Sequence, residues 1–401
     1  MVEFLTPVGI TTYRAASASA RAMSRFCRTL RPAYRAPVKH TPHTPTDFSR
    51  IEESLKTLHQ NRLGWASMQA SEKAKILEHC LGNIVDISDE WVQKTVQVKG
   101  SYENGEGEET MALSSIALMT RDYVTCLKAN YKPAIPKVRH NKERDQVVCE
   151  VFPTGLLRLA FLGMKGEVWV KRGEGLTQGL APDVLDGSTP PPVFLILGAG
   201  NQAPAVVGDI LHCLCTQNGV GILKMNPVND FLGPVIEKAF KPLVDKGVLQ
   251  IVYGGGETGA FLCNHDLVTE VHMTGSADTF NAIKWKGKPP RPSAGATIPK
   301  ATFEKPLYGE LGCITPYIIV PGDWSDSDID SKARQCVSAK VHNAGHNCIA
   351  LEVLVVPKGW HLREKFMDRI RHYLSKCENR SAWYPGSRKR YDDFLQRFSG
   401  C

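Results

Sequence analysis

Between residues 193 and 276 the sequence alternates short apolar runs with longer segments of helical spacing, and this alternation is the strongest constraint on the fold. Helices are expected at 204–215 and 232–244 between the apolar runs. The runs, which predict strands, are Val193–Leu197, Val220–Lys224, Leu249–Tyr253 and Glu270–Thr274. Strict alternation predicts a parallel sheet with helices on both faces, in which ligands bind at the carboxyl ends of the strands.

Glycine turns follow these strands at 198–200, 254–259 and 275–276. A glycine turn that opens a helix offers backbone N–H groups to a phosphate. None of the turns has the GxGxxG fingerprint with an acid about 20 residues later, and each alone is better explained as a tight connection than as a phosphate site. Lys224 ends its strand, where it either meets a phosphate or ribose or is a solvated charge.

The flanking regions have simpler patterns. Residues 46–132 are predicted to be helical, with helices beginning at Asp47 and Ser71 and spanning 88–99 and 110–132. Residues 146–170 have the composition of a hairpin or ribbon, and 277–305 is expected to be irregular. Strands are predicted at 317–320 and 351–356, and helices at 325–342, at 361–377 and within 384–401.

The net charge of +8 is concentrated at the N-terminus, where residues 1–46 hold seven basic residues and one acid. This segment is rich in Arg, Ala and Ser, which predicts a transit peptide over residues 1–45, mitochondrial first and plastid second. A disordered basic tail or an over-extended gene start, on a cytoplasmic protein, explains it as well. The nearly neutral remainder argues against nucleic-acid binding, and no apolar run is long enough for a membrane span.

Cys348 lies in a turn of small residues, with Ala344 and Gly345 before it and Ala350 after it. Small neighbours leave room for a substrate beside a nucleophilic thiol. The chain has twelve cysteines without paired CxxC spacing, so the alternative is an ordinary core thiol in a reducing compartment. His342 and His346 have a spacing that zinc ligands use, but without further ligands no metal site is predicted.

Glu310 stands between glycine and leucine just before the strand predicted at 317–320. A glutamate in such a place is usually solvated. If it is buried beside a cavity, its pKa rises and it can serve as a general base.

Six features occur in sequence order: Asn201, Lys224, the turn at 256–259, Thr274-Gly275-Ser276, Glu310-Leu311-Gly312 and Asn343 to Cys348. Their order and spacing resemble the aldehyde dehydrogenase superfamily. The resemblance runs from about Phe48 to the C-terminus and is most specific at 310–312 and 343–348. The segments 223–229 and 384–386 resemble a little-studied, mainly bacterial branch.

The resemblance implies a Rossmann-like α/β cofactor domain over 46–145 and 171–306, with a parallel sheet. It further implies an oligomerisation ribbon at 146–170 and an α/β catalytic domain over 307–401. Family members continue well beyond residue 401, so the catalytic domain is expected to be incomplete. A homo-oligomer is expected only if the missing segment is present.

The implied reaction is oxidation of a small-molecule aldehyde to a carboxylic acid with NAD or NADP. Cys348 would attack the aldehyde to form a thiohemiacetal and then a thioester, Asn201 and the Cys348 N–H would hold the oxyanion, and Glu310 would activate the hydrolytic water. Lys224 would contact the adenosine ribose. The other implied cofactor-binding residues are Gly256, Gly259, Thr274, Gly275, Ser276 and Leu311.

Two positions depart from the family pattern. Pro227 stands where an acid often grips the ribose, which leaves the choice between NAD and NADP open, and Phe280 stands where a second glycine often follows Gly275. Two alternatives to a hydrolytic enzyme also stay open: an acylating, coenzyme A-dependent relative, and an inactive truncated homologue that binds nucleotide.

Overall fold

The computed structural model describes residues 37–100, 105–135, 137–155, 157–178, 190–289, 300–377 and 380–398. Most of the predicted leader lies outside these ranges. None of the helices in the described ranges has the length and apolar character needed to cross a bilayer.

A five-stranded parallel sheet forms the centre of the molecule, in the order β6-β5-β4-β7-β8. The strands are β4 (Val193–Leu197), β5 (Val220–Lys224), β6 (Leu249–Val252), β7 (Glu270–Gly275) and β8 (Leu307–Leu311). Every residue of β4 and β5 is buried, as expected for strands covered on both faces. The predicted parallel sheet is therefore confirmed.

The fifth strand, β8, was not predicted. It pairs with β7, with Thr274 opposite Glu310, so Glu310 lies within a strand of the central sheet rather than before the next strand. The sheet thus extends past the predicted domain boundary at residue 306. Polar and glycine residues interrupt the apolar pattern at Tyr308-Gly309-Glu310, which hides this strand in the sequence.

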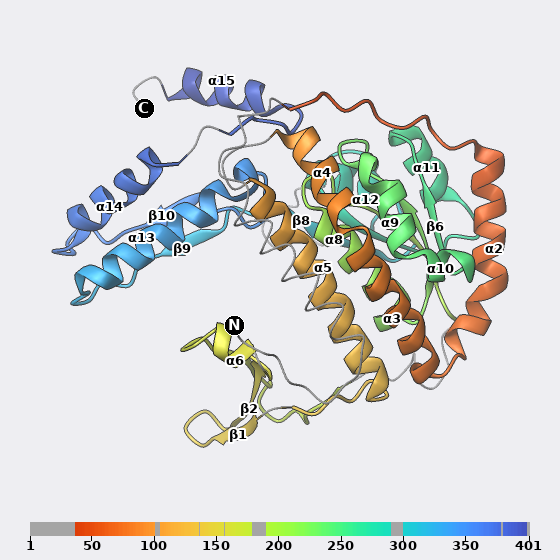
Figure 1. The fold of residues 1–401 in the computed structure, drawn as a ribbon, viewed down its shortest axis with the longest axis horizontal. Helices are drawn as coiled ribbons and strands as arrows, with labels where there is room; N and C mark the ends of the chain where they lie inside the picture. The colour runs from red at the N-terminus through yellow and green to blue at the C-terminus, as the bar shows by residue number, and fades with distance from the viewer. Residues whose placement is uncertain are drawn as a thin grey trace.

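Helices cover both faces of the sheet (Figure 1). They are α2 (Phe48–Ala66), α3 (Ala70–Asp86), α4 (Ser88–Lys99), α5 (Gly105–Lys128), α8 (Ala203–Leu211), α9 (Gly233–Ala239), α10 (Lys241–Asp245), α11 (Gly256–Asn264) and α12 (Ala277–Trp285). In α2 the apolar side chains of Ile51, Leu55 and Leu58 are buried.

Two helix predictions were wrong. Helix α5 begins at Gly105 rather than at residue 110, and α12 forms where irregular chain was predicted. The Ser276 hydroxyl accepts a hydrogen bond from the Thr279 N–H at 3.1 Å, which caps α12 despite its short apolar pattern.

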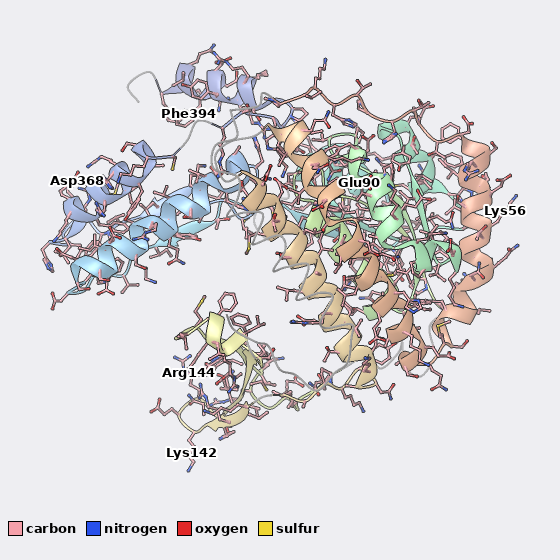
Figure 2. The ribbon with its side chains drawn as sticks, in the orientation of Figure 1. Lys56, Glu90, Lys142, Arg144, Asp368 and Phe394 are labelled. Atoms are coloured by element: carbon pink, nitrogen blue, oxygen red, sulfur yellow. The ribbon has the colours of Figure 1, made fainter. Side chains whose placement is uncertain are left out.

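A three-stranded antiparallel ribbon projects away from the central sheet beyond the end of α5 (Figure 1). It contains β1 (Lys137–Asn141), β2 (Gln146–Phe152) and β3 (Gly166–Trp169), with the short α6 (Leu157–Ala160) beside them. Lys142 and Arg144 lie at the tip of the ribbon (Figure 2). Its role in oligomerisation stays a prediction.

A smaller lobe holds the parallel pair β9 (Pro316–Ile318) and β10 (Val353–Val355). Helices α13 (Asp326–Val341) and α14 (Arg363–Ser375) pack on it around a separate apolar core, and α15 (Ser387–Arg397) follows. Ser325 caps α13 in a reciprocal capping box with Asp328. The strands and helices predicted beyond residue 317 are confirmed, with shorter strands.

Candidate functional site

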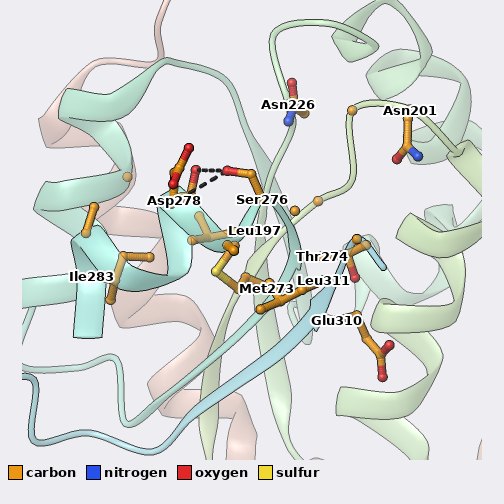
Figure 3. A pocket seen from close by; sticks show the side chains of 18 of the residues that line it. Leu197, Asn201, Asn226, Met273, Thr274, Ser276, Asp278, Ile283, Glu310 and Leu311 are labelled. Atoms are coloured by element: carbon orange, nitrogen blue, oxygen red, sulfur yellow. Dashed lines mark hydrogen bonds between the residues drawn. The ribbon is translucent and has the colours of Figure 1, made fainter. Parts of the chain in front are cut away.

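A cavity of about 1110 Å³ lies at the carboxyl ends of the central strands (Figure 3). Its walls come from the ends of β4, β5, β7 and β8, from α11 and α12, and from the loop that carries Cys348. All ten residues predicted for the site line it: Asn201, Lys224, Gly256, Gly259, Thr274, Gly275, Ser276, Glu310, Leu311 and Cys348. Folding thus brings together residues separated by up to 147 positions, since 348 minus 201 is 147.

The chain before Cys348 has an unusual backbone. After α13, three consecutive residues adopt left-handed conformations: Asn343 at φ 53°, Ala344 at φ 54° and Gly345 at φ 80°. Glycine tolerates this region, whereas alanine is strained in it by roughly 1–2 kcal/mol. These residues reverse the chain after the helix, and Cys348 is left exposed on the cavity wall.

The buried side chain of Asn343 links the loop that carries Cys348 (the cysteine loop) to the turn that follows β4. Its Nδ2 donates to the Asn201 carbonyl oxygen at 2.9 Å and to the His346 carbonyl oxygen at 3.0 Å. The Asn201 Nδ2 donates to the same His346 oxygen at 3.0 Å. A side-chain amide has two N–H groups, so Asn201 retains one for a ligand.

The sequence did not predict that the Asn343 side chain holds the cysteine loop, although Asn343 belongs to the motif at 343–348. Nothing in the sequence separates a buried structural amide from one that faces a substrate. The signal available was its position at a helix end, where asparagine tolerates a left-handed backbone better than most residues.

Glu108 of α5 anchors the same loop from the other side. Its carboxylate accepts a hydrogen bond from the Asn343 N–H, pairs with Arg380 at 2.9 Å and lies 3.2 Å from the His342 Nε2. Arg380 also donates to the Val341 carbonyl oxygen at 3.0 Å. Sequence reasoning placed Glu108 in a connecting stretch, and no local pattern links it to a loop 235 residues away.

Lys224 is only 8% exposed, so it is not the solvated strand-end charge considered as an alternative. Its Nζ donates to the carbonyl oxygens of Met225, at 3.2 Å, and of Gly254, at 3.0 Å. Burial lowers the pKa of this ammonium. Because an ammonium has three donors, one remains for a ligand in the cavity.

The glycine turns leave open backbone around the cavity. A Cβ added to Gly256 would meet nothing within 4 Å, and one added to Gly259 would lie 3.5 Å from the Lys224 Cε. The neighbouring Thr274 hydroxyl donates to the Asp209 Oδ2 at 2.8 Å, which fixes the end of β7.

Glu310 is exposed on β8, so it lacks the burial on which the general-base hypothesis depended. In the view of Figure 3 its carboxylate points away from Asn201. Burial and the neighbouring His272 lower the pKa of His212. The charges of Asp209 and Glu310 raise it to a smaller extent.

His346 was noted in the sequence only for its spacing from His342. It lines the cavity, and its ring packs against the rings of Trp383 and Tyr384 at centroid distances of 5.6 and 5.4 Å. Burial, with the charges of Arg390 and Lys99, lowers its pKa to about 4, so the imidazole is neutral near pH 7. Among the residues that the structure describes, no group of three metal-binding side chains is present.

Phe280 packs on the edge strand. A Cβ added to Gly309 would lie 2.7 Å from the Phe280 Cδ2, so the ring occupies the space that this glycine leaves free. The bulky departure from the family pattern is therefore accommodated against β8, and Phe280 is not among the residues that line the cavity.

Several known proteins are similar in sequence to part of this chain. The profile of the Aldehyde dehydrogenase family matches residues 203–384. D-glyceraldehyde dehydrogenase (NADP(+)) of Thermoplasma acidophilum is 33% identical over 172 residues, which cover 42% of this chain and 30% of that enzyme. Betaine aldehyde dehydrogenase of Brucella anthropi is 31% identical over 124 residues, which cover 31% of this chain and 22% of that enzyme. The matched sequence thus spans less than a third of either relative.

Solved structures share the fold over a longer stretch. Aldehyde dehydrogenase C of Pseudomonas syringae, complexed with NAD+ and octanal, matches with a TM-score of 0.55 and 14% identity over 86% of this chain and 59% of its own. Proline utilization A of Bradyrhizobium japonicum matches with a TM-score of 0.60 and 15% identity over 96% of this chain and 34% of its own. The predicted α/β fold class is thereby confirmed, and the match of residues 203–384 to the Aldehyde dehydrogenase family supports the resemblance seen in the motifs at 310–312 and 343–348.

Proposed function

We propose that the protein oxidises an aldehyde to a carboxylic acid with NAD(P)+, through a covalent intermediate on Cys348. The observation that carries the proposal is the single cavity in which an exposed thiol, a side-chain amide and a carboxylate adjoin glycine-rich strand ends. The names of relatives, among them an enzyme named for NADP(+), support the same chemistry.

The described residues fit a dinucleotide. Two helices of nine residues, α11 and α12, begin at the cavity, and helix N-termini attract phosphates. The open backbone at Gly256 allows close approach, and Lys224 offers a donor from a buried site. Pro227 also lines the cavity and places no carboxylate there to repel a 2′-phosphate, which supports use of NADP+ as well as NAD+.

The bound dinucleotide supplies the hydride acceptor. Cys348 supplies the nucleophile: its sulfur adds to the aldehyde carbon and forms a thiohemiacetal. The free N–H of Asn201 and the backbone N–H of Cys348 are the donors assigned to the resulting oxyanion. After oxidation the acyl group remains on Cys348 as a thioester, and Glu310 removes a proton from the water that hydrolyses it.

The exposure of Glu310 favours a second candidate. A carboxylate that points away from Asn201 is poorly placed to direct water onto the thioester unless it rotates. In an acylating enzyme coenzyme A takes the acyl group instead, and no base for water is required. The hydrolytic reaction is preferred because Glu310 lines the same cavity as Cys348.

The test is to mix purified protein with NADP+ or NAD+ and a panel of aldehydes and to follow absorbance of the reduced cofactor. Turnover by the natural protein and its loss by at least 1000-fold in Cys348→Ser support the proposal. Cys377→Ser, at a partly exposed thiol outside the cavity, is the matched control and should retain activity.

The two candidates separate on Glu310→Gln. If this variant turns over only when coenzyme A is added, the acylating reaction is correct. Turnover that persists in Cys348→Ser contradicts both.

A further inference from the structure

A second exposed thiol lies beside Cys348. Cys313 directly follows the Glu310-Leu311-Gly312 motif, and its backbone N–H donates to the Cys348 carbonyl oxygen at 3.2 Å. Its Sγ also lies 3.2 Å from that oxygen, as a thiol donor. Of the cysteines that the structure describes, only Cys313 and Cys348 are exposed; the others are buried or half-buried.

The backbone at this point is fixed by pairing that continues along the chain. The Glu352 N–H donates to the Ile314 carbonyl oxygen at 3.2 Å, and β9 then pairs with β10 from Pro316 and Val353 onward. Cys313 precedes β9 and Cys348 lies in the turn before β10, so the hydrogen bond from the Cys313 N–H to the Cys348 carbonyl oxygen joins two neighbouring segments. A hydrogen bond of 3.2 Å from the Cys313 N–H to the Cys348 carbonyl oxygen limits the distance between their Cα atoms to about 7 Å, which overlaps the roughly 4.4–6.8 Å range that a disulfide requires.

We propose that Cys313 and Cys348 form a reversible disulfide when the protein meets a hydroperoxide, which blocks the thiol assigned as the nucleophile. The inference rests on the proposed role of Cys348 for its effect on activity. The formation of the bond itself depends only on the two thiols.

The chemistry balances in two steps. The Cys348 thiolate attacks the hydroperoxide, the O–O bond breaks, and a sulfenic acid forms with release of water or an alcohol after protonation. The Cys313 sulfur then attacks the sulfenic sulfur, an S–S bond forms, and water leaves with the thiol proton. The peroxide is reduced by two electrons and the two thiols are oxidised by the same number. A dithiol reductant then returns the disulfide to two thiols by exchange.

This pairing gives Cys348 a defined route away from irreversible oxidation. A sulfenic acid without a resolving thiol proceeds to sulfinic acid in excess peroxide, and dithiols do not reduce that product. The Cys313 Sγ, which lies 3.2 Å from the Cys348 carbonyl oxygen, is the resolving thiol in this proposal. Oxidation is therefore expected to switch the site off reversibly.

The experiment treats the reduced full chain with hydrogen peroxide, alkylates the remaining thiols and maps disulfide-linked peptides by mass spectrometry. The expected result is a peptide that joins residues 313 and 348, a drop of at least 10-fold in alkylation of Cys348, and full recovery with dithiothreitol. In Cys313→Ser, where the hydroxyl retains a donor to the Cys348 carbonyl, dithiothreitol should restore less than a tenth of the alkylation.

Cys377→Ser serves as the matched control and should form the link as the natural protein does. Sulfinic acid on Cys348 with Cys313 still free, or a link from Cys348 to another cysteine, overturns the proposal. The readout needs no aldehyde, so an inactive protein that forms the link refutes the proposed function alone. An active protein that does not form it refutes the redox pair alone.

Discussion

The central sheet and the β9–β10 sheet are both built from short apolar strands, but they are covered differently. In the central sheet, every side chain of β4 is buried. In the smaller sheet, Tyr317 and Leu354 pack on the apolar core of the lobe, while Ile318 and Val355 are 69% and 45% exposed. The first sheet is held by packing on both faces, whereas the second is held on one.

The difference bears on how the site is positioned. The glycine-turn side of the cavity stands at the ends of the central strands, and the cysteine loop lies between the central sheet and the half-covered one. Apolar packing therefore positions the glycine turns, whereas hydrogen bonds made by Asn343 and Glu108 hold the cysteine loop. Stability should be sensitive to apolar substitutions in the first region and to polar ones in the second.

The largest difference is expected from truncation of apolar strand residues. Leu195→Ala, at a site with no exposure, should lower the free energy of unfolding by about 2–5 kcal/mol because it leaves a cavity. Val355→Ala is the matched change on the open face and should cost less than about 1 kcal/mol. Denaturant unfolding of both variants measures this, and equal losses would contradict the comparison.

A buried charge in the packed region should make stability depend on pH. Burial lowers the pKa of Lys73, which is bound to Asn218, from 10.5 to about 8. Between these values the unfolded chain carries the proton and the folded chain does not, so the free energy of unfolding should rise as pH increases from about 8 to 10.5. The rise should be about 1–3 kcal/mol.

Unfolding midpoints measured across this pH window test the prediction. Lys73→Met should remove most of the rise. A variant with the same slope as the natural protein would show that another group is responsible.

In the polar region, Asn343→Ala should cost about 1–3 kcal/mol, because it leaves the carbonyls of Asn201 and His346 with fewer partners. Hydrogen exchange of the 342–348 segment should accelerate while exchange in β4 is unchanged. Asn83→Ala is the control, since its amide also donates to backbone carbonyls but near the surface. Unchanged exchange in the loop would mean that Asn343 does not hold it.

The smallest effect is expected at the strained alanine. Ala344→Gly should raise the free energy of unfolding by about 0.5–1 kcal/mol, because glycine adopts a left-handed backbone without strain. Ala339→Gly, in helix α13, should lower it by about 1 kcal/mol. Thermal unfolding of the two variants should therefore shift in opposite directions, and shifts of the same sign would contradict the assigned conformation.

The fold was predictable where a local pattern determines the element. Apolar runs such as Val193–Leu197 predict a strand from the local sequence alone. Strand β8 was missed because Gly309 and Glu310 break its apolar pattern, and its stability comes from pairing with β7. Helix α12 was missed because its start depends on the single cap at Ser276 rather than on a strong apolar face.

The sequence predicted which residues come together at the site. Strand ends of a parallel sheet share one edge, so Asn201, Lys224 and Thr274 had to converge there. The ties from Glu108 and Arg380 were not predictable, because they join segments far apart in sequence through contacts that no local spacing encodes. Exposure of Glu310 likewise follows from its place on an edge strand, which only the assembled sheet reveals.

The central claim is that Cys348 carries the acyl group at the rim of the nucleotide-binding sheet. The most direct measurement is mass spectrometry of Glu310→Gln after mixing with NAD(P)+ and an aldehyde that the natural protein oxidises, with coenzyme A absent. The account predicts about one equivalent of reduced cofactor per chain and an acyl adduct on the peptide that contains Cys348. A natural protein that turns over while this variant forms no adduct, or forms it on another residue, would contradict the account.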